Sequence, residues 1–202
     1  MKFNEIDGDY AEFGSHGGMT FSLAYHESRS AGYPCRLWAF DSFRGLPTPK
    51  TPEDRHPKWI EGRFVTGIAD FHRICRDNGL PRSSYEIVPG YYDETLSMSN
   101  PNIKLRNICM AYVDCDLYSS TTSVLRFILP RLKHGMIIAF DDYFCWSSTQ
   151  LSGERRAHNQ ILESNEEWRF VPYIQFGVFG LSFAVENKKL DYQELEERHL
   201  VV

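Results

Sequence analysis

Short apolar runs alternate with segments of helical spacing along most of the chain. Met19, Leu23 and Ala24 recur at helical spacing after the first run, and Val124, Ile128 and Leu132 do so after the fourth. The nearly continuous run at 108–113 is typical of a strand that is covered on both faces. The predicted strands cover residues 9–14, 36–43, 85–88, 108–113 and 136–140.

The last third of the chain breaks this alternation. A polar, helix-compatible segment at 154–166 is followed by two apolar runs, 168–175 and 181–185, with no helical segment between them. Two such neighbouring runs predict an antiparallel hairpin. The whole pattern predicts an α/β fold: a doubly wound, mostly parallel sheet with helices on both faces and a C-terminal antiparallel hairpin.

Residues 44–66 form the one long segment without a period, and they include four prolines, at 47, 49, 52 and 57. A loop of this length inside a compact domain is usually functional or disordered. We therefore expect it to act as a lid, in which case His56 could reach a bound acceptor.

Composition limits the classes of function. With 202 residues, of which 42% are hydrophobic, the chain suits a single domain over 1–202. A net charge of −5 and scattered basic residues argue against a nucleic-acid partner. We find neither an apolar run of membrane-spanning length nor a signal sequence, and so expect no membrane contact and a cytoplasmic protein. The five cysteines form no CxxC pair, which argues against disulfides and zinc.

Aspartates follow directly after two of the predicted strands, in YVDCDLY (112–118) and IIAFDDY (137–143). Ligands of parallel sheets bind at the carboxyl ends of strands, so Asp114, Asp141 and Asp142 would converge if these strands are neighbours. Three carboxylates without nearby cysteine or regularly spaced histidine suit Mg²⁺ better than zinc. The alternative is that they are solvated loop acids or helix caps, and we expect Asp116 to point elsewhere or to cap the following helix.

The segment EFGSHGG (12–18) joins the first predicted strand to the first predicted helix. Its glycines allow a tight turn close to a ligand, and the helix start supplies free N–H groups. His16 replaces the second glycine of the dinucleotide pattern GxGxxG and would crowd a pyrophosphate. Asp41 ends the next strand and can accept both hydroxyls of a ribose. A nucleoside ligand without a pyrophosphate is therefore predicted, although a simple strand–helix turn is the alternative.

Seven segments in this order carry a resemblance to a known family. They are EFGSHGG (12–18), FDSFRGLP (40–47), WIEGRF (59–64), PGYYDETL (89–96), VDCDLYSST (113–121), GMIIAFDDY (135–143) and GERRA (153–157). Together they resemble the macrocin-type (TylF/MycF-like) O-methyltransferases over about residues 9 to 160. The resemblance implies a class I methyltransferase (Rossmann-like) fold, S-adenosylmethionine as cofactor, dependence on magnesium, and methylation of sugar hydroxyls in natural products.

Carried onto the matching positions, the resemblance implies a set of site residues. Asp114, Asp141 and Asp142 map to metal ligands, and Asp141 is also the candidate base for the hydroxyl proton. Tyr91 and Tyr92 could stack near the adenine or simply pack in the core. The expected cofactor-binding residues are Glu12, Gly14, Ser15, His16, Gly18, Asp41, Ser42, Gly90, Tyr91 and Asp114.

The sequence leaves rival functions open. A catechol-type phenol could replace the sugar or polyol as the small-molecule acceptor, or the chain could be a non-catalytic domain that binds S-adenosylmethionine. An NAD-dependent dehydrogenase is disfavoured by His16. Relatives usually carry N-terminal helices that help assemble oligomers, whereas only eight residues precede Asp9 here, so the family resemblance allows a homo-oligomer without requiring one.

Overall fold

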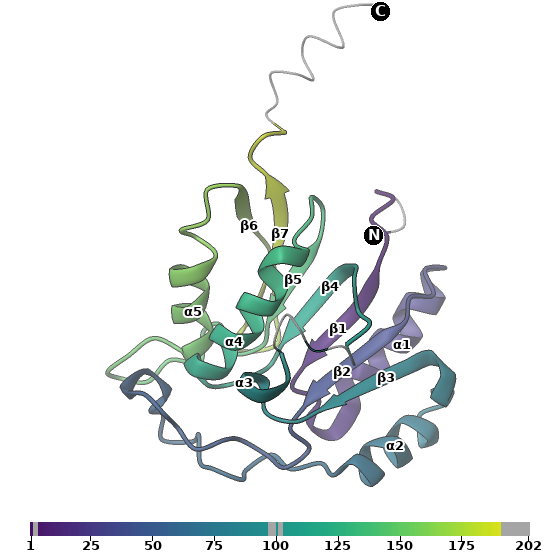
Figure 1. Ribbon diagram of the computed structural model, residues 1–202, viewed down its shortest axis with the longest axis horizontal. Coiled ribbons are helices and arrows are strands. Elements are labelled where there is room, and N and C mark those ends of the chain that lie inside the picture. Colours follow the sequence, from purple (N-terminus) through teal and green to yellow (C-terminus); the bar gives the residue numbers. More distant parts are fainter. Residues whose placement is uncertain (2–3, 97–99, 101–102, 191–202) are drawn as a thin grey trace, which may run out of the picture.

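One mixed sheet organises the computed structural model, which describes residues 1, 4–96, 100 and 103–190 (Figure 1). The strand order is β3-β2-β1-β4-β5-β7-β6. The first five strands run parallel, whereas β7 is antiparallel to both β5 and β6. The strands are β1 (Asp9–Phe13), β2 (Leu37–Asp41), β3 (Tyr85–Pro89), β4 (Ile108–Val113), β5 (Ile137–Phe140), β6 (Trp168–Phe176) and β7 (Gly180–Asn187). The predicted α/β fold with a C-terminal antiparallel hairpin is confirmed.

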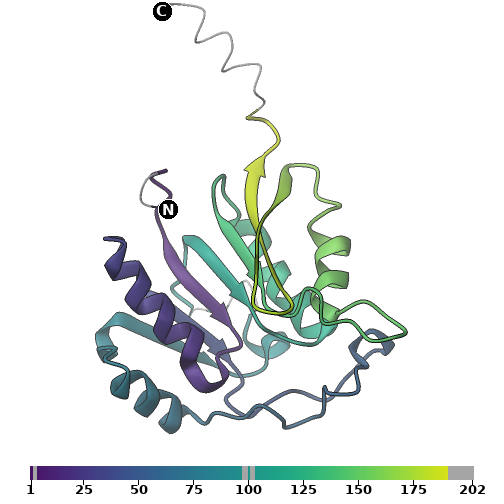
Figure 2. The same cartoon turned by 180° about the vertical axis from the view of Figure 1, so that it is seen from behind.

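Helices cover both faces of the sheet, as Figures 1 and 2 show from opposite sides. Phe21 and Phe71 bring α1 and α2 against one face, and Phe127 and Ala157 bring α4 and α5 against the other. This double covering explains why β2 and β4 are almost entirely apolar. The helices are α1 (Met19–Ser30), α2 (Ile68–Asp77), α3 (Tyr92–Thr95), α4 (Tyr118–Ile128) and α5 (Gly153–Ile161).

The register of the parallel strands aligns their carboxyl ends at the same edge of the sheet. Phe13 pairs with Phe40 on one side and Val113 on the other, and Val113 pairs with Phe140. The next residue of each strand therefore emerges at one edge of the sheet; these residues are Gly14, Asp41, Asp114 and Asp141. The chain order reverses at β1, between β2 and β4, which is where ligands bind in open α/β sheets.

One predicted helix has a different buried residue than its spacing indicated, and another helix was not predicted. The helix at Met19 exists, but Met19 and Leu23 are 79% and 58% exposed, and Phe21 is the buried residue that packs on the sheet. Their spacing therefore marked the outer face of α1. The sequence analysis also missed α2, whose Phe71 and Cys75 are buried one turn apart.

Residues 44–66 run along the carboxyl edge of the sheet (Figures 1 and 2) and contain only a 3₁₀ turn, Pro52–Asp54, as helical structure. Asp54, only 1% exposed, accepts hydrogen bonds from the N–H groups of Lys50 (2.9 Å) and Thr51 (3.0 Å) within the loop. Its other oxygen accepts the N–H of Ser119, 2.8 Å away in the first turn of α4. The loop is thus fastened to α4 through one buried carboxylate.

Two simpler expectations can be compared with the described residues. All five cysteines are free thiols. Within the described part of the chain, we find no helix of the length and apolarity needed to cross a bilayer.

We expect Asp54→Ala to lower the free energy of unfolding by about 2–4 kcal/mol, because it leaves three N–H groups without a charged acceptor. Urea denaturation followed by circular dichroism measures this change. The matched control is Glu53→Ala, which removes a neighbouring carboxylate that accepts none of these bonds. Equal losses in the two variants would show that Asp54 does not fasten the loop.

Candidate active site

A cavity of about 320 Å³ lies at the carboxyl edge, between the strand ends and the loop 44–66. We call it the central cavity. It contains every predicted site residue except Glu12, Ser15 and Gly18. Its lining consists of Gly14, His16, Asp41, Ser42, Gly45, Leu46, Pro47, Trp59, Phe64, Gly90, Tyr91, Tyr92, Asp114, Cys115, Asp116, Ser120, Asp141 and Asp142.

The glycine turn shapes one side of the central cavity. Gly14 has a φ of +92°, and a Cβ at this position would lie 1.8 Å from the carbonyl oxygen of Asp114. Only glycine lets β1 pass so close to the end of β4. Ser15 and Gly18 are buried and shape the turn from behind, where the N–H of Gly18 donates to the carbonyl oxygen of Ser15 over 3.0 Å.

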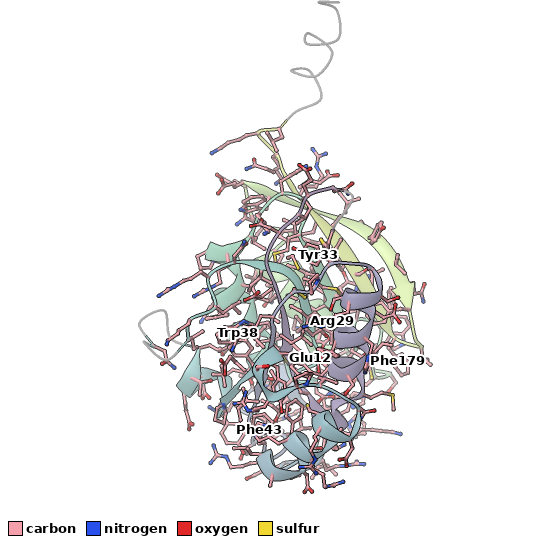
Figure 3. The ribbon with its side chains drawn as sticks, turned by 90° about the vertical axis from the view of Figure 1, so that its right-hand side faces the viewer. Glu12, Arg29, Tyr33, Trp38, Phe43 and Phe179 are labelled. Carbon is pink, nitrogen blue, oxygen red and sulfur yellow. The ribbon has the colours of Figure 1, made fainter. Side chains whose placement is uncertain are left out.

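Glu12 lies beneath this turn rather than in the cavity wall. Its carboxylate is completely buried beside α1 (Figure 3) and accepts hydrogen bonds from the hydroxyls of Tyr10 and Thr20. Burial raises the pKa of Glu12 to about 7, although the hydrogen bonds from Tyr10 and Thr20 act in the opposite direction. Glu12 therefore supports the turn, and direct contact with a cofactor stays a prediction.

Asp41 connects the glycine turn to the segment after β2. One carboxylate oxygen accepts the N–H of Ser15 at 2.8 Å, and the other accepts the N–H of Phe43 at 2.6 Å. Burial raises the pKa of Asp41 despite these two bonds. Each oxygen keeps a further lone pair, so the carboxylate can still accept hydrogen bonds from a ligand.

The two tyrosines after β3 have different environments. The guanidinium of Arg44 lies 4.6 Å above the ring of Tyr91, which lines the central cavity beside Gly90. Tyr92 packs against the main hydrophobic core and donates its hydroxyl to the carbonyl oxygen of Phe40 over 3.1 Å. Tyr91 is thus the ring available to a ligand, whereas Tyr92 is largely a packing residue.

Four aspartates form the opposite wall of the central cavity: Asp114 and Asp116 after β4, and Asp141 and Asp142 after β5. The pKa of Asp114 lies well above its ordinary value because the group is buried and because Asp141 and Asp142 are close. Among the described residues, no lysine or arginine lines this cavity. A crowded set of carboxylate oxygens without a protein counter-charge fits a hard cation such as Mg²⁺.

Asp116 contradicts the expectation that it points elsewhere or caps the following helix. The residue before α4 is Leu117, which provides no side-chain cap, and Asp54 accepts the N–H of Ser119 instead. Asp116 has a φ of +59°, a left-handed conformation that aspartate tolerates better than most residues, and its side chain lines the central cavity. Burial raises the pKa of Asp116 well above the ordinary value, and the nearby carboxylates of Asp114 and Asp142 act in the same direction.

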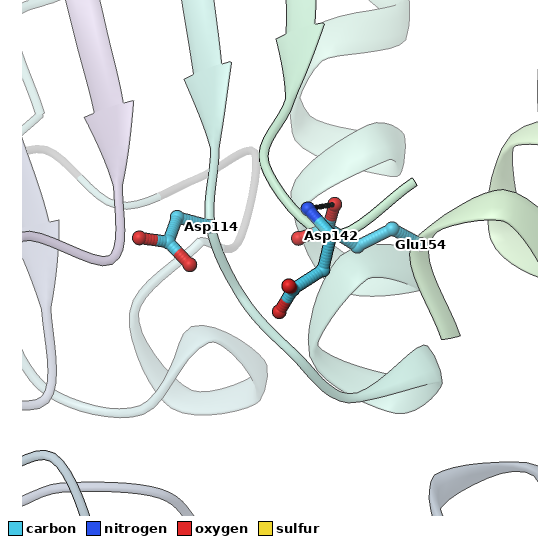
Figure 4. Close-up of side chains that lie close together, drawn as sticks. All are labelled: Asp114, Asp142 and Glu154. Atoms are coloured by element: carbon cyan, nitrogen blue, oxygen red, sulfur yellow. Dashed lines mark hydrogen bonds between the residues drawn. The ribbon is translucent and has the colours of Figure 1, made fainter. Parts of the chain in front are cut away.

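We call the four aspartates at 114, 116, 141 and 142 the acidic wall. Two further side chains form hydrogen bonds to this wall from the side that faces away from the cavity. The hydroxyl of Tyr112 donates a hydrogen bond to Asp141 Oδ1. Glu154, which begins the polar segment predicted at 154–166, is fully buried, and it accepts the N–H groups of Cys115 (3.1 Å) and Asp142 (2.9 Å). Carboxylate oxygens of Asp114, Asp142 and Glu154 lie within 4.8 Å of one another (Figure 4). In the sequence, Glu154 was marked only by its place in GERRA (153–157), one of the segments that carry the family resemblance.

Aromatic side chains of the loop 44–66 form the rim. Trp59 and Phe64 line the central cavity and meet edge to face, with ring centroids 6.1 Å apart. His56 does not line this cavity; it packs on the outer side of Trp59 at 4.6 Å between centroids. There a second, open cavity of about 580 Å³ is bounded by His56, Trp59 and residues 147–150. Trp59 therefore contributes to both cavities.

Comparison with known proteins identifies relatives over most of the chain. The family described as macrocin O-methyltransferase (TylF) matches residues 1–167. The 8-demethyl-8-(2,3-dimethoxy-alpha-L-rhamnosyl)-tetracenomycin-C 4'-O-methyltransferase of Streptomyces olivaceus is 29% identical over 148 residues, covering 68% of this chain and 54% of the relative. Demethyldecarbamoylnovobiocin O-methyltransferase of Streptomyces niveus is 26% identical over 150 residues, covering 69% and 54%. The chain thus spans about half the length of these curated relatives.

Solved structures of similar shape are also methyltransferases. The O-methyltransferase NovP has a TM-score of 0.75 at 20% identity, covering 93% of this chain and 75% of NovP. The calicheamicin methyltransferase CalS11 has a TM-score of 0.68 at 25% identity, covering 89% and 73%. These likenesses identify the fold as the class I, Rossmann-like methyltransferase fold that the sequence predicted.

The raised pKa of Glu12 predicts a pH-dependent stability. A folded-state pKa of about 7, above the ordinary value of 4.5, gives a stabilising contribution that is complete below the ordinary value and is lost as pH rises through about 7. Glu12→Gln cannot ionise; its amide keeps one acceptor oxygen, and the hydroxyl of Tyr10 or Thr20 that faces the NH₂ group can rotate to accept a hydrogen bond from it. Between about pH 5 and pH 8, urea denaturation should therefore show a smaller fall in the free energy of unfolding for Glu12→Gln than for the wild type.

The control for this comparison is Glu27→Gln, which removes an exposed carboxylate from α1. It should keep the pH dependence of the wild type. A Glu12→Gln variant with an unchanged slope would contradict the assignment of this titration to Glu12.

Proposed function

Because the chain belongs to the macrocin O-methyltransferase (TylF) family, we propose that it transfers a methyl group from S-adenosylmethionine to a hydroxyl of a sugar or related natural-product acceptor. The observation that carries the proposal is the division of the central cavity. Gly14 and Asp41 stand on one side, and Asp114, Asp141 and Asp142 stand on the other. A methyl donor and a cation-held acceptor would meet between them.

The glycine side suits the nucleoside part of the donor. Gly14 allows close approach of the backbone, and the lone pairs left on Asp41 can accept the two ribose hydroxyls. Gly90 and Tyr91 lie next to Asp41, because the N–H of Gly90 donates to its carbonyl oxygen over 3.0 Å. This neighbourhood makes the ring of Tyr91 a surface on which the adenine can stack.

The acidic side suits a cation and the acceptor hydroxyl. Asp114, Asp141 and Asp142 would hold Mg²⁺, whose positive charge lowers the pKa of a hydroxyl bound beside it. Asp141 would accept the hydroxyl proton while the oxygen forms its bond to the methyl carbon and the carbon–sulfur bond breaks. Tyr112 donates to Asp141 Oδ1 and so restrains the rotation of this carboxylate.

The acceptor would enter from the side of the loop 44–66. The names of the two relatives from Streptomyces describe methylation of a rhamnosyl group on tetracenomycin C and of a novobiocin precursor. CalS11 is described as a TDP-rhamnose 3'-O-methyltransferase. The indole face of Trp59 borders the central cavity and can pack against the C–H groups of a sugar ring. The open cavity beyond Trp59 leaves room for the remainder of such an acceptor.

Calorimetry with S-adenosylmethionine and its demethylated product, S-adenosylhomocysteine, tests the donor. We expect both to bind even with a chelator present, because Gly14, Asp41 and Tyr91, which would hold the nucleoside, are not among the proposed cation ligands. Methyl transfer to a panel of rhamnosides should then require added Mg²⁺. Failure of both compounds to bind would contradict the proposal. Binding without turnover on any sugar or catechol would favour a non-catalytic binding domain.

Asp141→Asn tests the acidic side. We expect methyl transfer to fall by at least about 100-fold, because the variant loses a ligand charge and the proposed base, while the affinity for S-adenosylhomocysteine changes little. Turnover assays and calorimetry on the same preparations separate these effects. Asp77→Asn, at the exposed end of α2, is the matched control. Unchanged turnover in Asp141→Asn would remove Asp141 from the mechanism.

A further inference from the structure

Glu154 joins the two loops that carry the acidic wall. One carboxylate oxygen accepts the N–H of Cys115, next to Asp114, and the other accepts the N–H of Asp142. The loops follow different strands, β4 and β5, and the two accepting oxygens belong to one fully buried side chain. Glu154 does not itself line the central cavity. It therefore stands behind the wall and bridges its two halves.

We propose that Glu154 is a positioning residue that sets the spacing between the β4 and β5 loops, so that Asp114 and Asp142 can share one cation. This inference rests on the proposed function and names the group that organises its metal site. The two bonds act on the backbone beside the ligands rather than on the ligands' side chains. Loss of either hydrogen bond would let the loop after β4 move relative to the loop after β5.

The start of α5 is built to bring this carboxylate to its place. Gly153 packs so closely on the turn before α4 that a Cβ would lie 2.4 Å from the nitrogen of Tyr118 and 2.8 Å from the carbonyl oxygen of Asp116. Ser152 caps the helix by accepting the N–H of Arg155 over 3.2 Å, and it donates to the carbonyl oxygen of Tyr143 over 2.9 Å. Contacts with both loops thus fix the first turn of α5, and Glu154 lies at its second residue.

Two other roles for Glu154 make different predictions. As a metal ligand, it would need an oxygen that faces the central cavity, but Glu154 does not line that cavity. If Glu154 only stabilised the core, its substitution would weaken ligand binding on both sides of the central cavity to the same extent. A positioning role instead affects cation binding more than it affects binding at Gly14 and Asp41, because Glu154 makes its hydrogen bonds only to the loops after β4 and β5.

Conservative substitutions separate the positioning role from a general structural role in the full chain. Glu154→Gln keeps the size of the side chain but puts an amide NH₂ group against one of the two N–H groups, which breaks one bridge bond. Glu154→Asp keeps the charge but is one methylene shorter, so it cannot reach both donors. Glu163→Gln is the matched control, because Glu163 is an exposed carboxylate just after α5 that contacts neither loop.

Binding of Mn²⁺, as a paramagnetic substitute for Mg²⁺, is measured by electron paramagnetic resonance, and binding of S-adenosylhomocysteine by calorimetry. We expect Glu154→Gln to weaken Mn²⁺ binding by about tenfold or more and to leave S-adenosylhomocysteine affinity within about twofold. Glu154→Asp should also weaken Mn²⁺ binding, and Glu163→Gln should match the wild type. Cooperative thermal unfolding establishes that each variant is folded.

The possible outcomes test the positioning role of Glu154 separately from the proposed metal site. If the wild type binds no Mn²⁺, the metal site itself is wrong, and the inference fails with it. If the wild type binds Mn²⁺ and both folded Glu154 variants bind it equally well, the positioning role alone is overturned. Equal losses of Mn²⁺ and S-adenosylhomocysteine binding would also overturn it in favour of a general structural role. Should Glu154→Gln fail to fold, Glu154→Asp provides the same comparison.

Discussion

The carboxyl edge of the sheet is held together by buried carboxylates that accept backbone N–H groups from two segments each. Asp41 joins the glycine turn to the segment after β2, Asp54 joins the loop 44–66 to α4, and Glu154 joins the loops after β4 and β5. A hydrogen bond to a charged group contributes about 1.5–3 kcal/mol, roughly twice that of a neutral one. These three side chains therefore organise loops that contain little regular structure of their own.

The acids at this edge consequently fall into two groups. Those that accept two or three N–H groups hold the loops of the site in place, although burial still raises the pKa of Asp41 and of Glu154. Asp114, Asp116 and Asp142 instead face one another across a cavity, and their mutual repulsion adds to burial in raising the pKa of Asp114 and Asp116. Unlike the first group, they gain most from a cation. This difference separates residues that build the site from residues that would use it, although all are aspartate or glutamate in the sequence.

The sequence predicted the strands, which depend on local pattern, but not the side-chain positions that depend on contacts with distant segments. Each strand was predicted within a few residues, because buried parallel strands are apolar runs that end at polar loops, and register then brought Asp41, Asp114 and Asp141 together. The helix α1 was predicted from the spacing of Met19 and Leu23, although these two side chains are exposed and Phe21 is the one that packs on the sheet. Asp116 and Glu154 were misplaced because one depends on a left-handed backbone angle and the other on N–H groups in two distant loops.

The loop over the site and the acidic wall are mechanically linked. Asp54 binds the N–H of Ser119 only three residues after Asp116, and Gly153 packs on the same turn between them. Residues 50–54, the turn at 116–119 and the start of α5 therefore form one connected body. Opening of the whole loop would break the charge-assisted hydrogen bond from Ser119 to Asp54, whereas movement of the aromatic segment from Trp59 to Phe64 would leave this bond intact. A lid at this site is thus most easily built from the aromatic segment, with Asp54 as its fixed base.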